Sequence, residues 1–512
     1  MMTRVLAMSQ EKPNKSLVSC KRTRPALVAL ILSSGLWGCT LGPDYQRPEL
    51  NMPAQFDKAL PQVESNEAVA DEWQAFFLNP DLQILIRQAL NNNINLAMMQ
   101  SRLRAARAEG RVVDAALWPE LGLEFEAERS LSSAITNKDP SAETDVNFNG
   151  VASWELDVWG ANRRASEAAL ANTLSQAELL EASKISLISD IATAFYELTD
   201  IEQRLKISRE TAEIRAKELQ LARLRRANGM ISGLDVHQAE VEYQSAMVTL
   251  PQLEYDSKAK RNQLLILLGA YDHPLPELPK LVSSEFPESL AVGVPSQLLS
   301  RRPDVRASEL ALVAATAEVG VAKSAFFPGF TITAEYGRGS DSLDNLFSSK
   351  GLTWSLLGGI TAPIFNAGKI SAEYEIANEA QLQAMLAYRS TVLNAYMEVR
   401  NAMNDYQRTQ QALIEQQRLL DASSEYVRLA RLRYQNGVAT SLDLMDAQRQ
   451  RFSAELSLSE SKRDKLLAMI ALYRALRGGA PVKSNPGNTV TSVEFLEDIA
   501  QQLVGHFGVS VT

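Results

Sequence analysis

Two stretches of 67 residues, 161–227 and 369–435, contain no glycine and no proline. This feature constrains the fold more than any other, because nothing inside either stretch would end an α-helix. The first stretch also carries apolar residues at alternating spacings of four and three, as in a helix packed against others: Leu187, Ile191, Ala194, Leu198, Ile201 and Leu205. At 1.5 Å per residue each helix would be about 100 Å long. Its many charged residues exclude a bilayer span.

The second half of the chain repeats the first. The segment Ala222–Gly229 recurs as Ala430–Gly437, and the pair Leu234-Asp235 recurs as Leu442-Asp443, both at an offset of 208. A fixed offset of this kind indicates duplication. We therefore expect two homologous structural repeats, 82–268 and 304–477.

Each repeat also contains two shorter helical segments. These are residues 82–117 and 235–268 in the first repeat, and 304–326 and 443–476 in the second. Two helices of about 35 residues placed end to end match the length of the long one. Both short helices of a repeat would then end near mid-height, and the remaining segments, 39–81, 269–303 and 478–512, would gather there as an equatorial region.

Between the first short helix and the long helix of each repeat, the apolar period changes to two. Leu121, Leu123 and Phe125 alternate with glutamates, and the pattern predicts β-hairpins over residues 120–158 and 329–364. Strands of about ten residues suit a membrane barrel, but four strands cannot close one. Two copies would give eight strands and three would give twelve; the acidic faces favour a wet lumen and hence twelve. The alternative is a soluble antiparallel sheet with one solvated face.

The N-terminus predicts a secretory signal over residues 1–38. Basic residues precede an apolar run, Ala26–Leu36, that is too short to span a membrane. Gly38 before Cys39 completes a lipobox, so Cys39 is expected to carry a diacylglycerol and an N-acyl chain, and no other cofactor is expected. Thr40 follows where an aspartate would favour inner-membrane retention, which predicts an anchor in the outer membrane. The alternative is a buried apolar N-terminal helix with an incidental cysteine.

Composition excludes several classes of function. Lys and Arg number 52 against 61 Asp and Glu, and a net charge of −9 disfavours nucleic-acid binding. Two cysteines and three histidines are too few and too scattered for a Cys/His metal site. Phosphate loops, zinc-protease motifs and nucleophile elbows are absent from the sequence, so we do not expect an enzyme.

The chain resembles the outer-membrane efflux factors, and within them the lipoprotein (NodT/OprM-like) branch of the TolC-type channels. The resemblance rests on Cys39, the segment Gly42–Tyr45, the segment Arg301–Arg306, the paired repeats and the hairpins of barrel length. It implies a mainly α fold with a small β part: a homotrimer with a 12-stranded outer-membrane β-barrel that continues into a 12-helix periplasmic α-barrel. It also implies a periplasmic adaptor protein and an inner-membrane pump as partners.

Two turns join the long helices to the returning ones, and the resemblance makes them the adaptor-docking tip. Their residues are Asn228, Gly229, Ser232, Gly233, Asn436, Gly437, Thr440 and Ser441. Asn and Gly tolerate the positive φ that ends a helix, and Ser or Thr can cap the helix that follows. A purely structural capping role is an equally good interpretation.

Asp443 and Asp446 lie three residues apart in the first turn of a returning helix, so they share a face. By resemblance they form the pore constriction, as stacked carboxylate rings that attract cations; the alternative is that they complement the helix dipole. In the first repeat Asp235 matches Asp443, but Gln238 stands in place of Asp446.

Tyr434 matches a family position that can hold the tip closed, with Asp235 as a plausible acceptor. An ordinary packed tyrosine is an equally good interpretation of Tyr434. Together with the family resemblance, these observations predict a passive exit duct of a tripartite (RND-type) efflux system, with drugs, solvents, organic acids and metal cations all open as cargo. The alternatives are a type I secretion duct for proteins and a non-conducting periplasmic scaffold lipoprotein.

Overall fold

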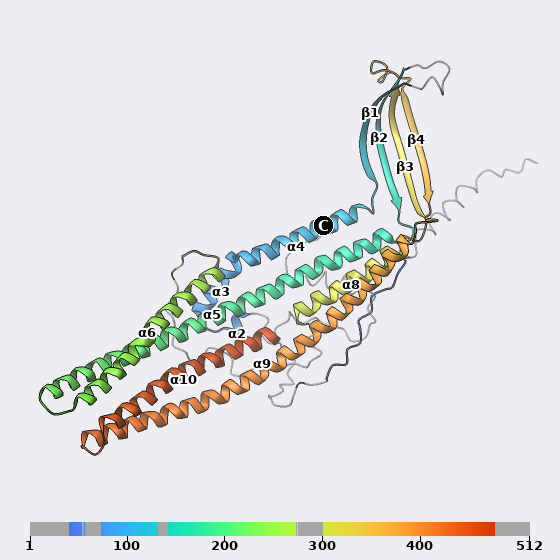
Figure 1. Ribbon diagram of the computed structural model, residues 1–512. Coiled ribbons are helices and arrows are strands. Elements are labelled where there is room, and N and C mark those ends of the chain that lie inside the picture. Colours follow the sequence, from blue (N-terminus) through green and yellow to red (C-terminus); the bar gives the residue numbers. More distant parts are fainter. Residues whose placement is uncertain are drawn as a thin grey trace, which may run out of the picture. The chain divides into compact units, whose positions relative to one another are not determined.

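A computed structural model describes residues 40–53, 56, 73–131, 142–272, 274 and 301–476 of the chain. Cys39, the signal segment and most of the expected equatorial segments lie outside these residues. The described residues fall into a sheet unit and a helical unit (Figure 1). The boundary between the units does not follow the two sequence repeats, because each repeat contributes two strands to one unit and its helices to the other.

The sheet unit is a four-stranded antiparallel sheet in the order β1-β2-β3-β4. Its strands are β1 (Glu120–Leu131), β2 (Ala142–Leu156), β3 (Gly329–Ser340) and β4 (Leu352–Thr361). The two hairpins expected from sequence are β1-β2 and β3-β4. They are joined by pairing of β2 with β3, where Trp154 lies opposite Ile332 and Val146 opposite Ser340. The duplication therefore produces one continuous sheet and not two separate hairpins.

The sheet has one apolar and one acidic face. The register aligns Leu123, Gly150, Tyr336 and Trp354 across the four strands, and side chains alternate between faces along each strand. On the other face Glu124 lies opposite Asn149, and Glu128 lies opposite Asp145. Leu123 is 80% exposed and Trp354 is 74% exposed, so much of the apolar face is open in a single chain, although Val146 on the same face is buried.

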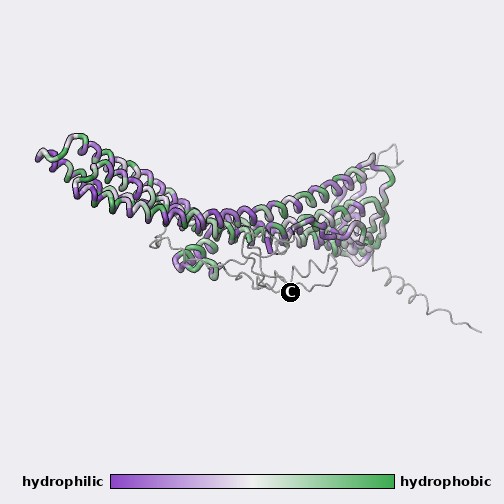
Figure 2. Tube along the Cα trace, turned by 90° about the horizontal axis from the view of Figure 1, so that it is seen from below, coloured by the Kyte–Doolittle hydropathy of each residue, from purple (hydrophilic) through white to green (hydrophobic). Residues whose placement is uncertain are grey.

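The helical unit is built on α5 (Ala161–Ala227) and α9 (Lys369–Gln435), the two long helices expected from sequence. Each is followed by a returning helix, α6 (Gly233–Leu268) or α10 (Ser441–Leu476) (Figure 1). Figure 2 shows hydrophilic and hydrophobic residues interleaved along the helices. Among the described residues, no helix combines the length and the apolar character needed to cross a membrane.

The helix expected over residues 82–117 is instead broken into α3 (Pro80–Asn92) and α4 (Ile94–Ala115). Asn93 takes an extended conformation between them, and its side chain accepts a hydrogen bond from the amide of Leu96. Its side-chain amide also donates to the carbonyl of Leu267, 2.9 Å away in α6. A hydrogen bond to a helix 174 residues away is invisible to local periodicity, which is why a single helix was predicted.

The remaining helices are α2 (Trp73–Phe76) and α8 (Pro303–Ser324), the latter ending two residues before its expected limit. The largest hydrophobic cluster joins both repeats. In it Phe76 and Phe77 pack on Tyr473 of α10 with ring centroids 4.6 and 5.1 Å apart. All three rings are buried, and such aromatic contacts stabilise beyond the area they remove from water.

Candidate functional site

The first tip turn connects α5 to α6. Asn228 donates from its side chain to the carbonyl of Leu224 at 2.9 Å, and Gly229 has a φ of +70°. Ser232 and Asp235 form a capping box: Ser232 N–H donates to the Asp235 carboxylate at 3.0 Å, and Asp235 N–H donates to Ser232 Oγ. Gly233 leaves room for the Arg226 guanidinium, whose Cζ would lie 3.3 Å from an added Cβ.

The second tip turn connects α9 to α10 with the same chemistry. Asn436 donates to the carbonyl of Leu432 at 2.8 Å, and Gly437 has a φ of +71°. Thr440 N–H donates to the Asp443 carboxylate at 2.9 Å, and Asp443 N–H donates back to Thr440 Oγ1 at 3.3 Å. Thr440 and Ser232 therefore cap the returning helices as expected, whereas Ser441 has a different role.

Side chains link the two tips within one chain. Ser441 Oγ donates to Asp235 Oδ1 at 2.7 Å, and Arg225 Nη1, in the last turn of α5, donates to the hydroxyl of Tyr434 in α9 at 3.1 Å. The hydrogen bonds from Ser441 and Ser232 lower the pKa of Asp235. The intrachain partners thus differ from the expected pair: Tyr434 is held by Arg225, and Asp235 by Ser441. Arg225 was not identified from the sequence, because only the fold places it beside the other turn.

The two aspartates of the expected constriction have different surroundings. Hydrogen bonds from Thr440 lower the pKa of the exposed Asp443, so this carboxyl group is ionised at neutral pH. Asp446 accepts hydrogen bonds from Arg449 and, at 2.9 Å, from Gln450. Arg449 also lies 3.7 Å from Glu242 of α6. The paired Arg449 offsets part of the charge of Asp446, which leaves Asp443 as the more exposed acid.

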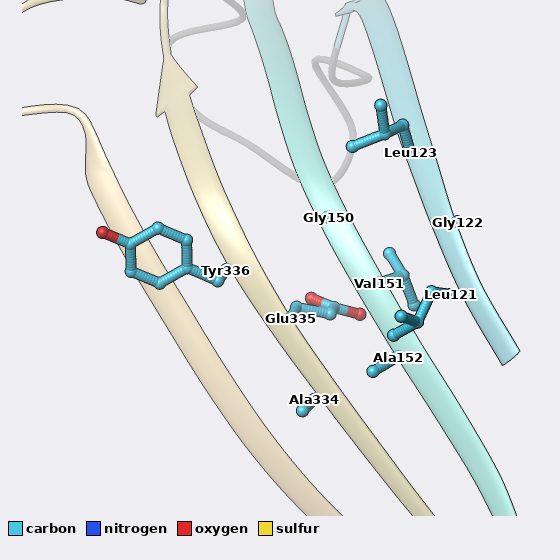
Figure 3. Close-up of a pocket in the computed structure, with 9 residues that line it drawn as sticks. All are labelled: Leu121, Gly122, Leu123, Gly150, Val151, Ala152, Ala334, Glu335 and Tyr336. Atoms are coloured by element: carbon cyan, nitrogen blue, oxygen red, sulfur yellow. The ribbon is translucent and has the colours of Figure 1, made fainter. Parts of the chain in front are cut away.

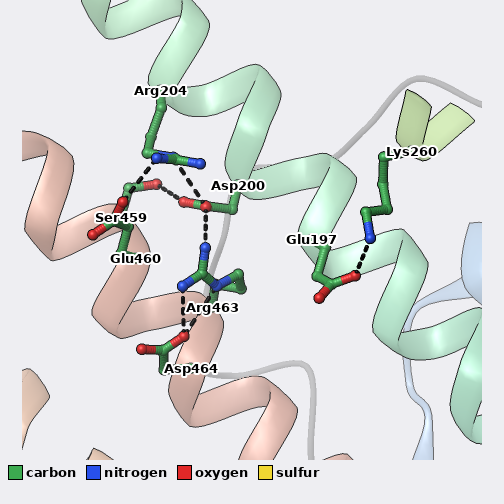
Figure 4. Close-up of polar contacts among 8 residues, drawn as sticks. All are labelled: Glu197, Asp200, Arg204, Lys260, Ser459, Glu460, Arg463 and Asp464. Atoms are coloured by element: carbon green, nitrogen blue, oxygen red, sulfur yellow. Dashed lines mark hydrogen bonds and ion pairs between the residues drawn. The ribbon is translucent and has the colours of Figure 1, made fainter. Parts of the chain in front are cut away.

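A buried polar network joins the repeats farther from the turns (Figure 4). Asp200 of α5 is fully buried and accepts from Ser459 at 2.6 Å and from Arg463 at 2.9 Å, both on α10. Arg204 lies 3.1 Å from the same carboxylate and 2.7 Å from Glu460. An acid beside Leu198 and Ile201 in an apolar seam was the sequence signal for this network, but its partners lie about 260 residues away along the chain.

An extended N-terminal segment, residues 42–53, packs on the helical unit; we call it the strap. Glu309 of α8 is 1% exposed and accepts from Tyr45 at 2.7 Å and from Arg47 at 2.6 and 3.0 Å. Burial and the Glu309 carboxylate raise the pKa of Tyr45. Gly42, with a φ of +104°, approaches Gly320 so closely that an added Cβ would lie 2.4 Å from the Gly320 Cα. Gly42 and Tyr45 carried the family resemblance, and close packing gives both a structural role.

Among the described residues, no group of three or more His, Cys, Asp and Glu side chains is arranged to hold a metal ion. The polar clusters of the helical unit are instead ion pairs and helix caps.

The chain matches known proteins over most of its length. The family described as outer membrane efflux protein matches residues 85–270 and 294–478. The probable efflux pump outer membrane protein TtgC of Pseudomonas putida is 31% identical over 481 residues, which cover 92% of this chain and 99% of TtgC. The cation efflux system protein CusC of Escherichia coli K12 is 32% identical over 461 residues, covering 89% and 98% of the two chains.

Solved structures agree with the sequence comparison. A CusC crystal structure superposes with a TM-score of 0.79 and 30% identity, covering 86% of this chain and all of that one. The open state of the Neisseria gonorrhoeae MtrE outer membrane channel superposes with a TM-score of 0.78 and 30% identity, covering 86% and 98%. The TolC-like fold expected from sequence is confirmed, and the chain belongs to the outer membrane efflux protein family.

Proposed function

We propose that this protein is the passive exit duct of a tripartite, RND-type efflux system, carrying small molecules across the periplasm and outer membrane. The observation that carries the proposal is the sheet, which has an exposed apolar face, an acidic face, and unpaired outer edges on β1 and β4. Open edges are not tolerated in lipid. Three copies would close a twelve-stranded barrel around the acidic faces, whereas eight strands would fill their own interior.

The tip turns are the proposed docking surface for a periplasmic adaptor protein, which would connect the duct to an inner-membrane pump. Met230 and Val438, one in each turn, are 72% and 67% exposed. Exposed apolar side chains on rigid, capped turns suit a protein partner. Relatives named as efflux-pump and cation-efflux components support this assignment.

The aspartates near the turns are the proposed constriction. In a trimer, three copies of Asp443 and three of Asp446 would surround the axis, and such rings attract cations and disfavour anions. The bonds between the two turns, from Ser441 to Asp235 and from Arg225 to Tyr434, would hold the tip closed until the adaptor and pump engage it.

Cys39 is the proposed lipid anchor, carrying a diacylglycerol and an N-acyl chain, and the sequence of the lipobox supports this proposal. Two or more acyl chains hold a protein firmly at a membrane. The strap begins three residues after Cys39, so the anchor would be attached to the segment that packs on α8.

Single-channel conductance in planar bilayers tests the function. We expect the wild type to give a small cation-selective current, and Asp443→Ala/Asp446→Ala to give a larger current with weaker cation selectivity, because the rings lose their charge. Asp421→Ala, an exposed carboxylate of α9 away from the turn, is the matched control and should behave as the wild type.

Absence of current from an intact wild-type trimer would reject the duct and favour the scaffold lipoprotein. A conducting protein whose deletion abolishes peptide export without causing drug hypersensitivity would favour the type I secretion duct.

A further inference from the structure

The described chain begins in contact with the end of the sheet. Thr40 and Leu41 belong to the sheet unit, whereas the strap that follows them belongs to the helical unit. The amide of Leu41 donates a hydrogen bond to the carbonyl of Trp159 at 3.0 Å. Thr40 lies against Gly160, because a Cβ added to Gly160 would lie 2.8 Å from Cγ2 and 3.0 Å from Cα of Thr40. Trp159 and Gly160 thus form a docking site for the two residues that follow Cys39; we call it the seat.

Trp159 is itself held in place by the second hairpin. Its indole Nε1 donates to the carbonyl of Pro328 at 2.8 Å, and its ring centroid lies 4.9 Å from that of Phe327. Phe327 and Pro328 directly precede β3, whereas Trp159 follows β2. The seat is therefore fixed by the two strands that join the hairpins into one sheet.

The internal duplication supplies a second copy of this turn for comparison. Gly368 corresponds to Gly160 at the offset of 208, and the two have φ values of +85° and +79°, a conformation that favours glycine. Among the described residues, a Cβ added to Gly368 would meet no atom within 4 Å. Ala367 stands in the place of Trp159 and is exposed. Both turns therefore need glycine for their backbone, but at Gly160 the missing side chain also makes room for Thr40.

The strand ends near the seat are apolar on one face. Leu121, Ala152 and Ala334 form one row across β1, β2 and β3, close to the ends at which β1 begins and β2 finishes (Figure 3). Leu121 is 80% exposed. Under the proposed function this face contacts lipid, and tryptophan is typical of membrane–water interfaces. Acyl chains attached close to Trp159 would therefore enter hydrocarbon alongside the strands.

We propose that the seat fixes the position of the lipid anchor, with Gly160 as the positioning residue. The proposal rests on the proposed lipidation of Cys39. Because Cys39 precedes Thr40 by one peptide bond, which joins Cα atoms about 3.8 Å apart, docking of Thr40 also limits where the acyl chains can start. The anchor and the sheet would then enter the membrane at one level, whereas an N-terminal segment without this contact would let the anchor insert at a distance from the sheet.

The test is amide hydrogen exchange of Leu41 in the purified, lipidated protein, measured by mass spectrometry with fragmentation to single residues. Gly160→Ala should accelerate this exchange by about tenfold or more, because the added methyl group displaces Thr40 and breaks the hydrogen bond to Trp159. Gly368→Ala is the matched control. It imposes the same backbone strain on the other copy of the turn without meeting a described atom, so Leu41 should exchange as in the wild type.

Two further variants separate the contact from the turn. Thr40→Gly removes Cβ and Cγ2, which lie 3.2 and 2.8 Å from the added atom, so Gly160→Ala/Thr40→Gly should exchange nearly as slowly at Leu41 as Thr40→Gly alone. A role of Gly160 in the turn alone would not respond to a change at residue 40. Trp159→Ala copies the residue of the second turn and keeps Gly160. It should also accelerate exchange, which keeps the test decisive if Gly160→Ala does not assemble.

Unchanged exchange in Gly160→Ala and Trp159→Ala, or equal acceleration in Gly368→Ala, would overturn the proposal. The intact mass of the same wild-type preparation separates the seat from the anchor. A mass without acyl chains on Cys39 rejects the proposed anchor, whatever the exchange rate. An acylated protein in which the Leu41 amide exchanges as fast as an unprotected one rejects only the seat.

Discussion

At the scale of single residues, the helical unit contains buried charges that lie close to partners of opposite charge. Asp200 illustrates this, because its carboxylate is inaccessible and receives three polar partners from two helices. Breaking a buried ion pair leaves a charge without compensation, which costs more than the pair contributes.

Asp200→Ala should therefore lower the free energy of unfolding by about 1–3 kcal/mol, since Ser459 loses its acceptor and Arg463 keeps only Asp464, 2.7 Å away. Guanidinium unfolding followed by far-UV circular dichroism would measure the loss. Asp190→Ala is the control: its side chain is 52% exposed and 3.8 Å from Arg474, so a change within about 0.5 kcal/mol is expected. If the double variant Asp200→Ala/Arg463→Met loses as much stability as Asp200→Ala alone, the weakened pairing of Arg463 is not the cause of the loss.

Because of Glu178, the free energy of unfolding should fall as pH rises, which is opposite to the effect of an ordinary ion-paired acid. Burial raises the pKa of its carboxyl group to about 7, although Arg306 at 2.8 Å lowers that pKa in part. The unfolded chain has the ordinary pKa of 4.5, so between these values the folded state holds the extra proton. Stability conferred by the neutral form is complete below about 4.5 and is lost as pH rises toward 7.

The Glu178→Gln variant cannot titrate at this position. Relative to the wild type, it should gain up to about 3 kcal/mol as pH rises through this window. Unfolding free energies of both proteins from pH 4.5 to pH 8 would reveal the gain. Glu210→Gln, which changes an exposed acid of the same helix that lies 4.0 Å from Lys206, is the control. A difference between wild type and Glu178→Gln that is constant with pH would contradict the assignment.

At the scale of elements, the strap is an extended segment held by one buried acid. Tyr45 and Arg47 bring three hydrogen bonds to Glu309, and Asp44 lies 2.6 Å from Arg164 of α5. The strap thus contacts helices of both repeats. Backbone without a regular hydrogen-bond ladder stays ordered only through such side-chain contacts.

Glu309→Ala should release the strap, because Tyr45 and Arg47 lose their common acceptor. Amide hydrogen exchange in residues 42–53 should accelerate at least tenfold while exchange in α9 stays unchanged. Glu309→Gln, which keeps the shape of the side chain and one acceptor oxygen, should give a smaller acceleration. Unaltered exchange in the strap of Glu309→Ala would show that the apolar contacts of Leu50 and Met52 hold it.

At the scale of the whole molecule, the contrast between the apolar and the acidic face of the sheet bears on insertion into the membrane. The outer membrane location of the family agrees with an apolar face on which Leu123 and Trp354 are largely exposed. A basic side chain on the lipid face of a strand is costly at mid-depth, whereas one on the lumen face is solvated.

Leu123→Arg and Glu124→Arg place the same side chain on opposite faces, one residue apart. Leu123→Arg should reduce the amount of trimer in outer-membrane fractions severalfold, because insertion loses about 2–4 kcal/mol per strand. Glu124→Arg should insert normally and shift ion selectivity toward anions. Equal insertion of the two variants would mean that the faces are assigned the wrong way round or that the sheet does not enter lipid.

The sequence by itself determined the ends of the two long helices, the turns and the alternation of the strands. Each of these is a local property: absence of Gly and Pro sets the length of α5 and α9, and Asn-Gly with a following Ser or Thr sets the turns. Duplication also determined that the two halves share one plan.

The tertiary structure alone decided which partners meet. It paired β2 with β3, broke the first short helix at Asn93, placed Arg225 on Tyr434, and gathered Ser459 and Arg463 around Asp200. Periodicity reveals which side of an element is buried, but the partner on that side is set by packing between segments about 200 residues apart. Side chains such as Asp200 and Glu309 therefore gained their roles only when the chain was folded.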